Sequence, residues 1–154
     1  MSTVPDATDR QILRELQRDG RISVAELAER VHLSATPCLR RLRKLERAGL
    51  IQGYTALVDE GALGFPVSAF AFVKLERTTQ DNARLFESAL QHFPEVIECN
   101  SVAGAHDYVL RIVAQDLAAY EAFVKNRLAT VEPVAQIETM IVLNRPLVRH
   151  ELPS

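Results

Sequence analysis

The sequence has no long hydrophobic run and only two cysteines, and these shortages exclude some classes of protein. No apolar stretch approaches the roughly 20 residues that a membrane-spanning helix requires. The first residues also lack the basic-then-apolar pattern of a secretory signal. We therefore expect a cytoplasmic protein with no membrane partner. Cys38 and Cys99 are far apart and form no CxxC motif, so we expect two free thiols rather than a disulfide.

The sequence also lacks the side-chain patterns of metal and catalytic sites. No metal-ligand spacing relates the four histidines, which are His32, His92, His106 and His150. His106 and Asp107 are adjacent, but neighbouring residues at a hairpin point in different directions and make a poor nucleophile–base pair. We expect no metal, no cofactor and no enzymatic activity.

Positive charge is concentrated in one short stretch. The chain of 154 residues has a net charge of −2, yet four arginines and one lysine lie between Arg40 and Arg47, where Glu46 is the single acidic residue. Salt bridges within the helix therefore do not account for this charge. At 100° per residue, Leu39, Leu42 and Leu45 share one helix face. The cations lie on the opposite face, with Arg41 nearer the boundary.

Three predicted helices bring this stretch into a helix-turn-helix. The first covers residues 9–19. The second starts at the capping box of Ser23 and Glu26. Ser34 can cap the third, which tolerates Pro37 in its first turn and ends at Gly49. The connection before the third helix is only about three residues long, as in a helix-turn-helix. Residues 50–64 predict a short strand or wing and then a linker.

A basic helix in this position favours double-stranded DNA as the partner, because its cations can contact phosphates and its first turn can reach base edges. A solvated helix face is the alternative interpretation. The candidate DNA-binding residues are Ser34, Thr36, Pro37, Arg40, Arg41, Arg43, Lys44 and Arg47.

Residues 66–152 predict strands and helices in the order β-α-β-β-α-β, a ferredoxin-like sandwich with both helices on one face of the sheet. The other face would carry apolar side chains such as Phe70 or Phe72, so we expect another copy of the chain to cover it. The fold class is α+β. The predicted domains are a winged helix-turn-helix at 1–60 and a ferredoxin-like domain at 61–154.

Three stretches closely resemble the Lrp/AsnC (leucine-responsive regulator, asparagine-synthetase regulator) family of bacterial transcription factors. They read DRQILRELQRDGRISVAELAERV, LSATPCLRRLRKLERAGLIQGYTALVD and FPEVIECNSVAGAHDYVLRIVAQDLAAYEAFV. The TPCLRR run and the G-x-x-D-Y loop are the specific signals. The resemblance implies a winged helix-turn-helix, a ferredoxin-like domain that dimerises through its sheet and assembles into tetramers or octamers, and an amino-acid effector bound between neighbouring dimers.

The resemblance also implies where the effector binds. The loop at 102–108 reads as a plain hairpin turn by composition, but in this family it lines the effector pocket. The last strand is the second region tied to effector response, although its apolar residues can equally be sheet core. The candidate effector-binding residues are Ala103, Gly104, His106, Asp107, Tyr108, Met140, Ile141 and Val142. Within this set, Asp107 is an acceptor for the ligand ammonium or an anchor for the loop.

We therefore expect a sequence-specific transcriptional regulator that responds to an amino acid or a related small metabolite. A ligand-independent architectural DNA-binding protein is the alternative. A small enzyme would need a paired acid and base, which the sequence does not offer. Arg145 and Arg149 follow the last strand and are expected in a solvated tail.

Overall fold

The computed structural model describes residues 4–153, and these form two compact units. The first consists of the described residues up to Leu57 together with those from Pro146 onward, and the second is Val58–Arg145. This division differs from the sequence-based domains, 1–60 and 61–154, mainly in its treatment of the C-terminal tail. No helix in the described part of the chain has the length and apolar character needed to cross a membrane.

The C-terminal tail belongs to the first unit because it contacts the first helix. The Arg18 guanidinium lies 3.0 Å from the Glu151 carboxylate, and the backbone N–H of Leu152 donates to Oε1 of Gln17 at 2.8 Å. The last residues are thus bound to the helical unit, although they follow a strand of the sheet in sequence.

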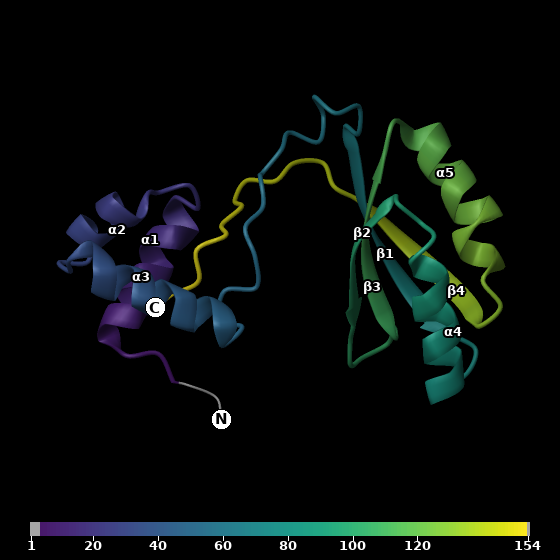
Figure 1. Cartoon of the computed structure of the whole chain (residues 1–154). Coiled ribbons are helices and arrows are strands. Elements are labelled where there is room, and N and C mark those ends of the chain that lie inside the picture. The colour runs from purple at the N-terminus through teal and green to yellow at the C-terminus, as the bar shows by residue number, and fades with distance from the viewer. Residues whose placement is uncertain (1–3, 154) are drawn as a thin grey trace. The chain divides into compact units, whose positions relative to one another are not determined.

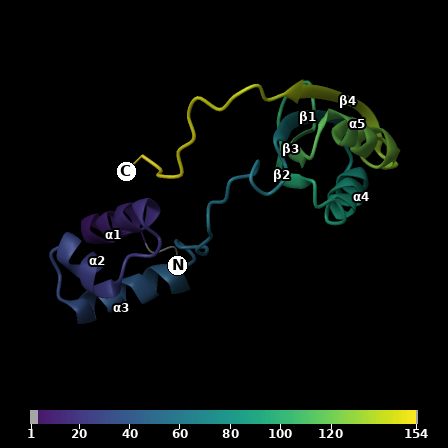
Figure 2. The same cartoon turned by 90° about the horizontal axis from the view of Figure 1, so that it is seen from above.

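Three helices form the first unit, and they pack together as Figures 1 and 2 show. The helices are α1 (Ala7–Arg18), α2 (Val24–Arg30) and α3 (Ala35–Arg47). Both α1 and α2 begin with a capping box, formed by Asp6 and Asp9 in α1 and by Ser23 and Glu26 in α2. Apolar side chains from all three helices meet in one core, which contains Ile12, Leu27, Ala28, Val31, Cys38 and Leu45. The predicted helix-turn-helix is confirmed.

The end of α3 is a Schellman turn. Gly49 has φ = 72°, and the N–H groups of Gly49 and Leu50 donate to the carbonyls of Glu46 and Leu45. The strand predicted after this turn is absent from the described residues 48–66. A lone strand has no stability without a neighbour to pair with, and this unit is helical. The segment after Gly49 is attached to α3 by a side-chain contact, in which the hydroxyl of Tyr54 donates to the Glu46 carboxylate at 3.0 Å.

The second unit confirms the ferredoxin-like prediction. Its elements in chain order are β1 (Val67–Leu75), α4 (Gln80–Leu90), β2 (Val96–Ser101), β3 (Tyr108–Ala114), α5 (Leu117–Asn126), the short 3₁₀ turn η1 (Leu128–Thr130) and β4 (Val134–Ile141). The strands form one antiparallel sheet in the order β2-β3-β1-β4. Helices α4 and α5 lie on the same face of this sheet (Figure 1).

The two faces of the sheet differ in composition because side chains alternate along each strand. Ala69, Ala71 and Val73 of β1 are buried in the core beneath the helices, together with Phe86 and Phe123. The intervening residues of β1 point to the open face, where the Phe70 side chain is 39% exposed. Its neighbour Met140 on β4 is 53% exposed. The described second unit therefore leaves uncovered a sheet face that exposes large apolar side chains among charged ones.

Candidate nucleic-acid interface and effector region

Helix α3 presents its cations on the face opposite to its core contacts. Cys38 and Leu45 are buried against the other helices, whereas the exposed side carries Arg40, Arg43, Lys44 and Arg47. The guanidinium of Arg47 also donates to the backbone carbonyl of Arg43 at 3.2 Å, which holds it along the helix. The amphipathic pattern read from the sequence therefore places four of the five cations in solvent.

The first turn of α3 is open to solvent at Ser34 and Thr36, and Pro37 is half-buried. Ser34 occupies the N-cap position with an extended backbone, as predicted. Within the described residues, however, its hydroxyl makes no capping hydrogen bond. The side chain of Ser34 is therefore not committed to the helix, and the predicted side-chain cap is wrong.

The fifth cation, Arg41, is half-buried and is paired with two carboxylates of the same unit. Its Nη1 atom lies 2.7 Å from a carboxylate oxygen of Asp6 and 2.7 Å from one of Asp9, and Nζ of Lys44 lies 3.8 Å from the other oxygen of Asp9. Asp9 is only 1% exposed. The acidic partners missing from α3 itself are thus supplied by α1. No local sequence pattern predicts this pairing, because the residues are more than thirty positions apart.

These side chains surround a hollow on the surface of the first unit. Its volume is about 410 Å³. It is lined by Asp6, Arg40, Arg41, Lys44 and Arg47. Four cations and one exposed carboxylate therefore face a shared space that is open to solvent, and this charge suits an anionic oxygen ligand such as a phosphate.

Asp107 fixes the loop between β2 and β3. Its two carboxylate oxygens accept hydrogen bonds at 2.8 Å from the N–H of Leu75 and from the hydroxyl of Thr78. The hydrogen bond from Leu75, assisted by that from Thr78, lowers the pKa of Asp107 below its ordinary value. Its backbone N–H donates to the carbonyl of Val73. Of the two roles considered for Asp107, these contacts favour the anchor.

The other loop candidates point in different directions. Gly104 has φ = 154°, a conformation that other residues rarely adopt. His106 lies over the open sheet face, with its ring 5.5 Å from that of Phe72 and its Nε2 atom 3.3 Å from Glu138. Tyr108 points to the helix-covered face, where it is buried and donates to Glu87 at 2.7 Å. Exposed Ala103 lies in the same loop.

The candidates on the last strand are separated from this loop. Met140 pairs with Phe70 and points to the open face, whereas Ile141 pairs with Ala69 and points to the other face. Val142 follows the strand and donates its N–H to Ser68, at the opposite end of β1 from the loop. A single copy of the chain therefore does not bring all the predicted effector residues together.

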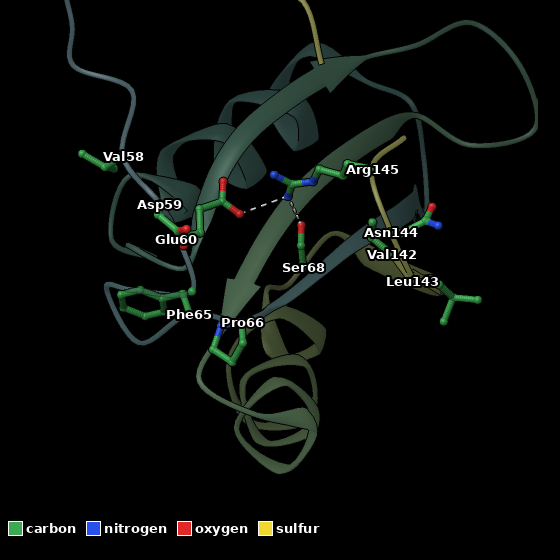
Figure 3. A pocket seen from close by; sticks show the side chains of 11 residues that line it. Val58, Asp59, Glu60, Phe65, Pro66, Ser68, Val142, Leu143, Asn144 and Arg145 are labelled. Atoms are coloured by element: carbon green, nitrogen blue, oxygen red, sulfur yellow. Dashed lines mark hydrogen bonds and ion pairs between the residues drawn. The ribbon is translucent and has the colours of Figure 1, made fainter. Parts of the chain in front are cut away.

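A second hollow lies at that opposite end of the sheet (Figure 3). Its volume is about 480 Å³, and it is lined by residues 58–61, 65–66 and 142–145 together with Ser68. Across it, Arg145 donates to Glu60 at 3.0 Å and to the hydroxyl of Ser68 at 2.6 Å. Arg111 of β3 donates to the other oxygen of Glu60 at 2.7 Å. Arg145 is thus part of an ordered network, so the prediction that it lies in a solvated tail is wrong.

This network ties the two ends of the second unit to its sheet. Glu60 lies just after the start of the unit and Arg145 at its end, so the chain enters and leaves through residues that are bonded to each other. Burial raises the pKa of Glu60, but the hydrogen bonds from Arg111 and Arg145 outweigh this effect, and the net pKa lies below the ordinary value of 4.5. Glu60, Ser68 and Arg111 were not predicted as site residues, because no local pattern in the sequence links them.

Comparison with known proteins relates both units to transcriptional regulators. Residues 5–52 match the family model described as winged helix-turn-helix DNA-binding, and residues 68–152 match the one described as the Lrp/AsnC ligand binding domain. The chain is 46% identical over 140 residues to the leucine-responsive regulatory protein of Rhizobium meliloti, covering 91% of this chain and 90% of that one. It is 43% identical over 148 residues to the Bkd operon transcriptional regulator of Pseudomonas aeruginosa, covering 96% and 97%.

Solved structures of similar proteins include two with a bound amino acid. A transcriptional regulator from Neisseria meningitidis in complex with L-methionine has a TM-score of 0.92 and 36% identity, covering 98% of this chain and 97% of that one. A feast or famine regulatory protein from M. tuberculosis complexed with L-methionine has a TM-score of 0.87 and 34% identity, covering 94% and 96%.

The Glu60 network predicts a pH-dependent effect of Glu60→Gln on stability. At pH 7 we expect the substitution to lower the free energy of unfolding by about 1 kcal/mol, because it removes hydrogen bonds to a charged group. The depressed pKa of Glu60 means that the wild-type advantage is present above pH 4.5 and disappears as the pH falls through the folded-state pKa. Urea unfolding between pH 7 and pH 3 measures the difference. Glu132→Gln, at an exposed carboxylate of the same unit, is the control. A pH-independent difference would contradict the assignment.

Proposed function

Because the chain belongs to the Lrp/AsnC family of transcriptional regulators, we propose that it binds double-stranded DNA through α3 and that an amino acid bound by its second unit alters DNA binding or assembly. The family consists of regulators, not enzymes. The observation that carries the proposal is the arrangement of α3, whose leucine side is buried while its cations stand in solvent beside an open first turn.

The proposed contacts divide by their place on α3. Ser34, Thr36, Pro37 and Arg40 belong to the first turns, and this end of the second helix in a helix-turn-helix meets the base edges. Arg43, Lys44 and Arg47 follow along the exposed side, where a phosphate backbone is the natural partner. Arg40 is the first of the exposed cations of α3. Its guanidinium can form two hydrogen bonds with guanine and so contribute to sequence preference.

The effector is proposed to be an amino acid with an apolar side chain. The support is the match to a ligand-binding domain and the L-methionine bound by two structural relatives of the chain. Its carboxylate and ammonium require several polar partners, because burying either charge unpaired is costly. The loop 103–107, held by Asp107, offers backbone groups beside Gly104 for this purpose. The candidates from the last strand lie elsewhere in one copy, which favours a site completed by a neighbouring subunit.

The proposed assembly starts from a homodimer that covers the open sheet face. Phe70 and Met140 are paired neighbours on this face, and both are substantially exposed in the single chain. Half-buried Phe72 and Val109 extend the apolar surface beside them. A contiguous apolar surface of this kind is typical of a protein interface. Assembly of such dimers into tetramers or octamers is the further proposal that follows from family membership.

One experiment tests DNA binding and effector response together. A duplex is selected from a random pool by the purified protein, and each of the twenty amino acids is then tested for its effect on thermal unfolding and on binding of that duplex. We expect at least one apolar L-amino acid to stabilise the protein, by about 2.7 kcal/mol at 100 times its dissociation constant. The same amino acid should shift the DNA-binding midpoint, and its D-enantiomer is the control.

The outcomes of this experiment separate the two functional proposals. Selection of DNA without any response to an amino acid would support a ligand-independent architectural protein instead. Failure to enrich any duplex, or to bind DNA at all, would contradict the role of α3.

Two arginines of α3 are expected to make different contributions to DNA binding. Arg47→Ala should reduce the slope of log affinity against log salt by about 0.9 for each phosphate that Arg47 neutralises, with little change in sequence preference. Arg40→Ala should weaken discrimination against a substituted base pair, by about 1–3 kcal/mol if Arg40 bonds guanine bidentately. Fluorescence anisotropy with the selected duplex and single-base variants, at several salt concentrations, measures both effects. Two variants that bind like the wild type would exclude this docking of α3.

The sheet-face dimer is tested by Phe70→Glu. In a monomer the new carboxylate is tolerated, because the side chain is partly exposed and Arg111 lies directly across the strand pair. In a dimer it would be buried in an apolar interface, so we expect sedimentation at micromolar concentration to show a monomer in place of the wild-type assembly. Leu85→Glu, an exposed apolar position on α4, is the matched control and should leave assembly unchanged. A monomeric wild type would contradict the proposal directly.

A further inference from the structure

The carboxylates of Asp6 and Asp9 share one nitrogen of Arg41, but they are placed very differently. Both are 2.7 Å from Nη1 of Arg41. The Asp9 side chain is 1% exposed and also faces Lys44, whereas the Asp6 side chain is 53% exposed and lines the basic hollow. Asp9 therefore holds Arg41 from within the protein. Asp6 contacts it from the side that faces solvent.

The position of Asp6 is one that a phosphate oxygen of DNA would favour. Around it are the guanidinium groups of Arg40, Arg41 and Arg47 and the ammonium group of Lys44, which all line the same hollow. A carboxylate and a phosphate present anionic oxygens to arginine with similar geometry. The N–H of Asp9 and the guanidinium of Arg41 lower the pKa of Asp6, so the group is ionised at neutral pH.

We propose that Asp6 competes with a DNA phosphate for Arg41 and thereby restrains the electrostatic, sequence-independent part of DNA binding. This inference rests on the proposed DNA binding through α3. When a phosphate displaces Asp6, Asp9 still holds Arg41 in place, so the guanidinium is already oriented for the new contact. On non-specific DNA, electrostatic attraction supplies nearly all of the affinity. A competing internal carboxylate at Arg41 therefore weakens such binding.

The capping role of Asp6 does not require its charge. Its Oδ1 atom accepts from the N–H of Asp9 at 2.8 Å, and asparagine or serine caps a helix about as well as aspartate. Asp6→Asn and Asp6→Ser therefore remove the competing charge while retaining a cap. Two different replacements guard against an effect peculiar to either side chain, and thermal unfolding of each full-length variant checks that α1 is preserved.

The experiment measures binding of the full-length protein to a mixed-sequence duplex of 30 base pairs by fluorescence anisotropy. We expect both Asp6 variants to bind it several-fold more tightly at 50 mM salt than the wild type does. The salt slope should steepen by up to about 0.9 per subunit, so that raising salt from 50 to 200 mM costs each variant roughly threefold more affinity per additional phosphate neutralised. Unchanged affinity and slope in both variants would overturn the proposal.

Two controls separate competition for Arg41 from a general effect of charge. Glu29→Gln makes the same change in charge at an exposed position of α2, and it should change binding less than Asp6→Asn does. In an Arg41→Gln background, Asp6→Asn should have almost no effect on the salt slope. Equal effects of Glu29→Gln and Asp6→Asn, or an effect that persists without Arg41, would overturn the proposal. A wild-type protein that does not bind DNA even at 50 mM salt would instead refute the proposed function, and this inference with it.

Discussion

The orientation of α3 depends on one buried carboxylate. Asp9 is almost completely inaccessible, and a carboxylate in that position is stable only while cations and N–H groups surround it. Arg41 and Lys44 of α3 supply the cations. Because the adjacent side of α3 is fixed by Cys38 and Leu45 in the apolar core, rotation of the helix would break both the ion pairs and the core packing. The outward direction of the remaining cations follows from these two constraints acting together.

The second unit uses carboxylates in the same way at its irregular segments. Asp107 binds the loop after β2 to the end of β1, and Glu60 binds the two ends of the unit to each other and to β3. In regular helices and sheets the backbone N–H and C=O groups form hydrogen bonds with each other. In loops, side chains must often supply these hydrogen-bond partners. Each of these acidic residues therefore stabilises a position at which the chain would otherwise be free to move, beside a surface proposed to bind a ligand or a partner.

Periodicity in the sequence was sufficient to predict the helices, the strands and the exposed stripe of α3, because these depend on neighbours within a few residues. Ser23 and Glu26 form the predicted capping box for this reason. The pairing of Arg41 with Asp6 and Asp9, and the network of Glu60 with Arg145, join residues more than thirty positions apart. No local pattern encodes such contacts. The prediction of a strand after Gly49 was wrong for a related reason. Alternating apolar and polar residues indicate a strand, but they do not provide the neighbouring strand with which it must pair.

The distribution of the effector candidates has a consequence for how a ligand can act. His106 and Met140 belong to the open face, whereas Tyr108 is fixed in the core by Glu87 and Ile141 points to the helix-covered side. A ligand that touched this whole set within one copy would have to pass through the sheet, so one copy supplies only part of the set to any site. If neighbouring copies supply the rest, ligand binding favours the assembly in which both parts meet. The free energy of this preference equals the difference between the ligand's binding free energies for the alternative assemblies. Effector binding and assembly are then a single equilibrium, and the DNA-binding units respond because assembly determines how many of them can reach the same duplex.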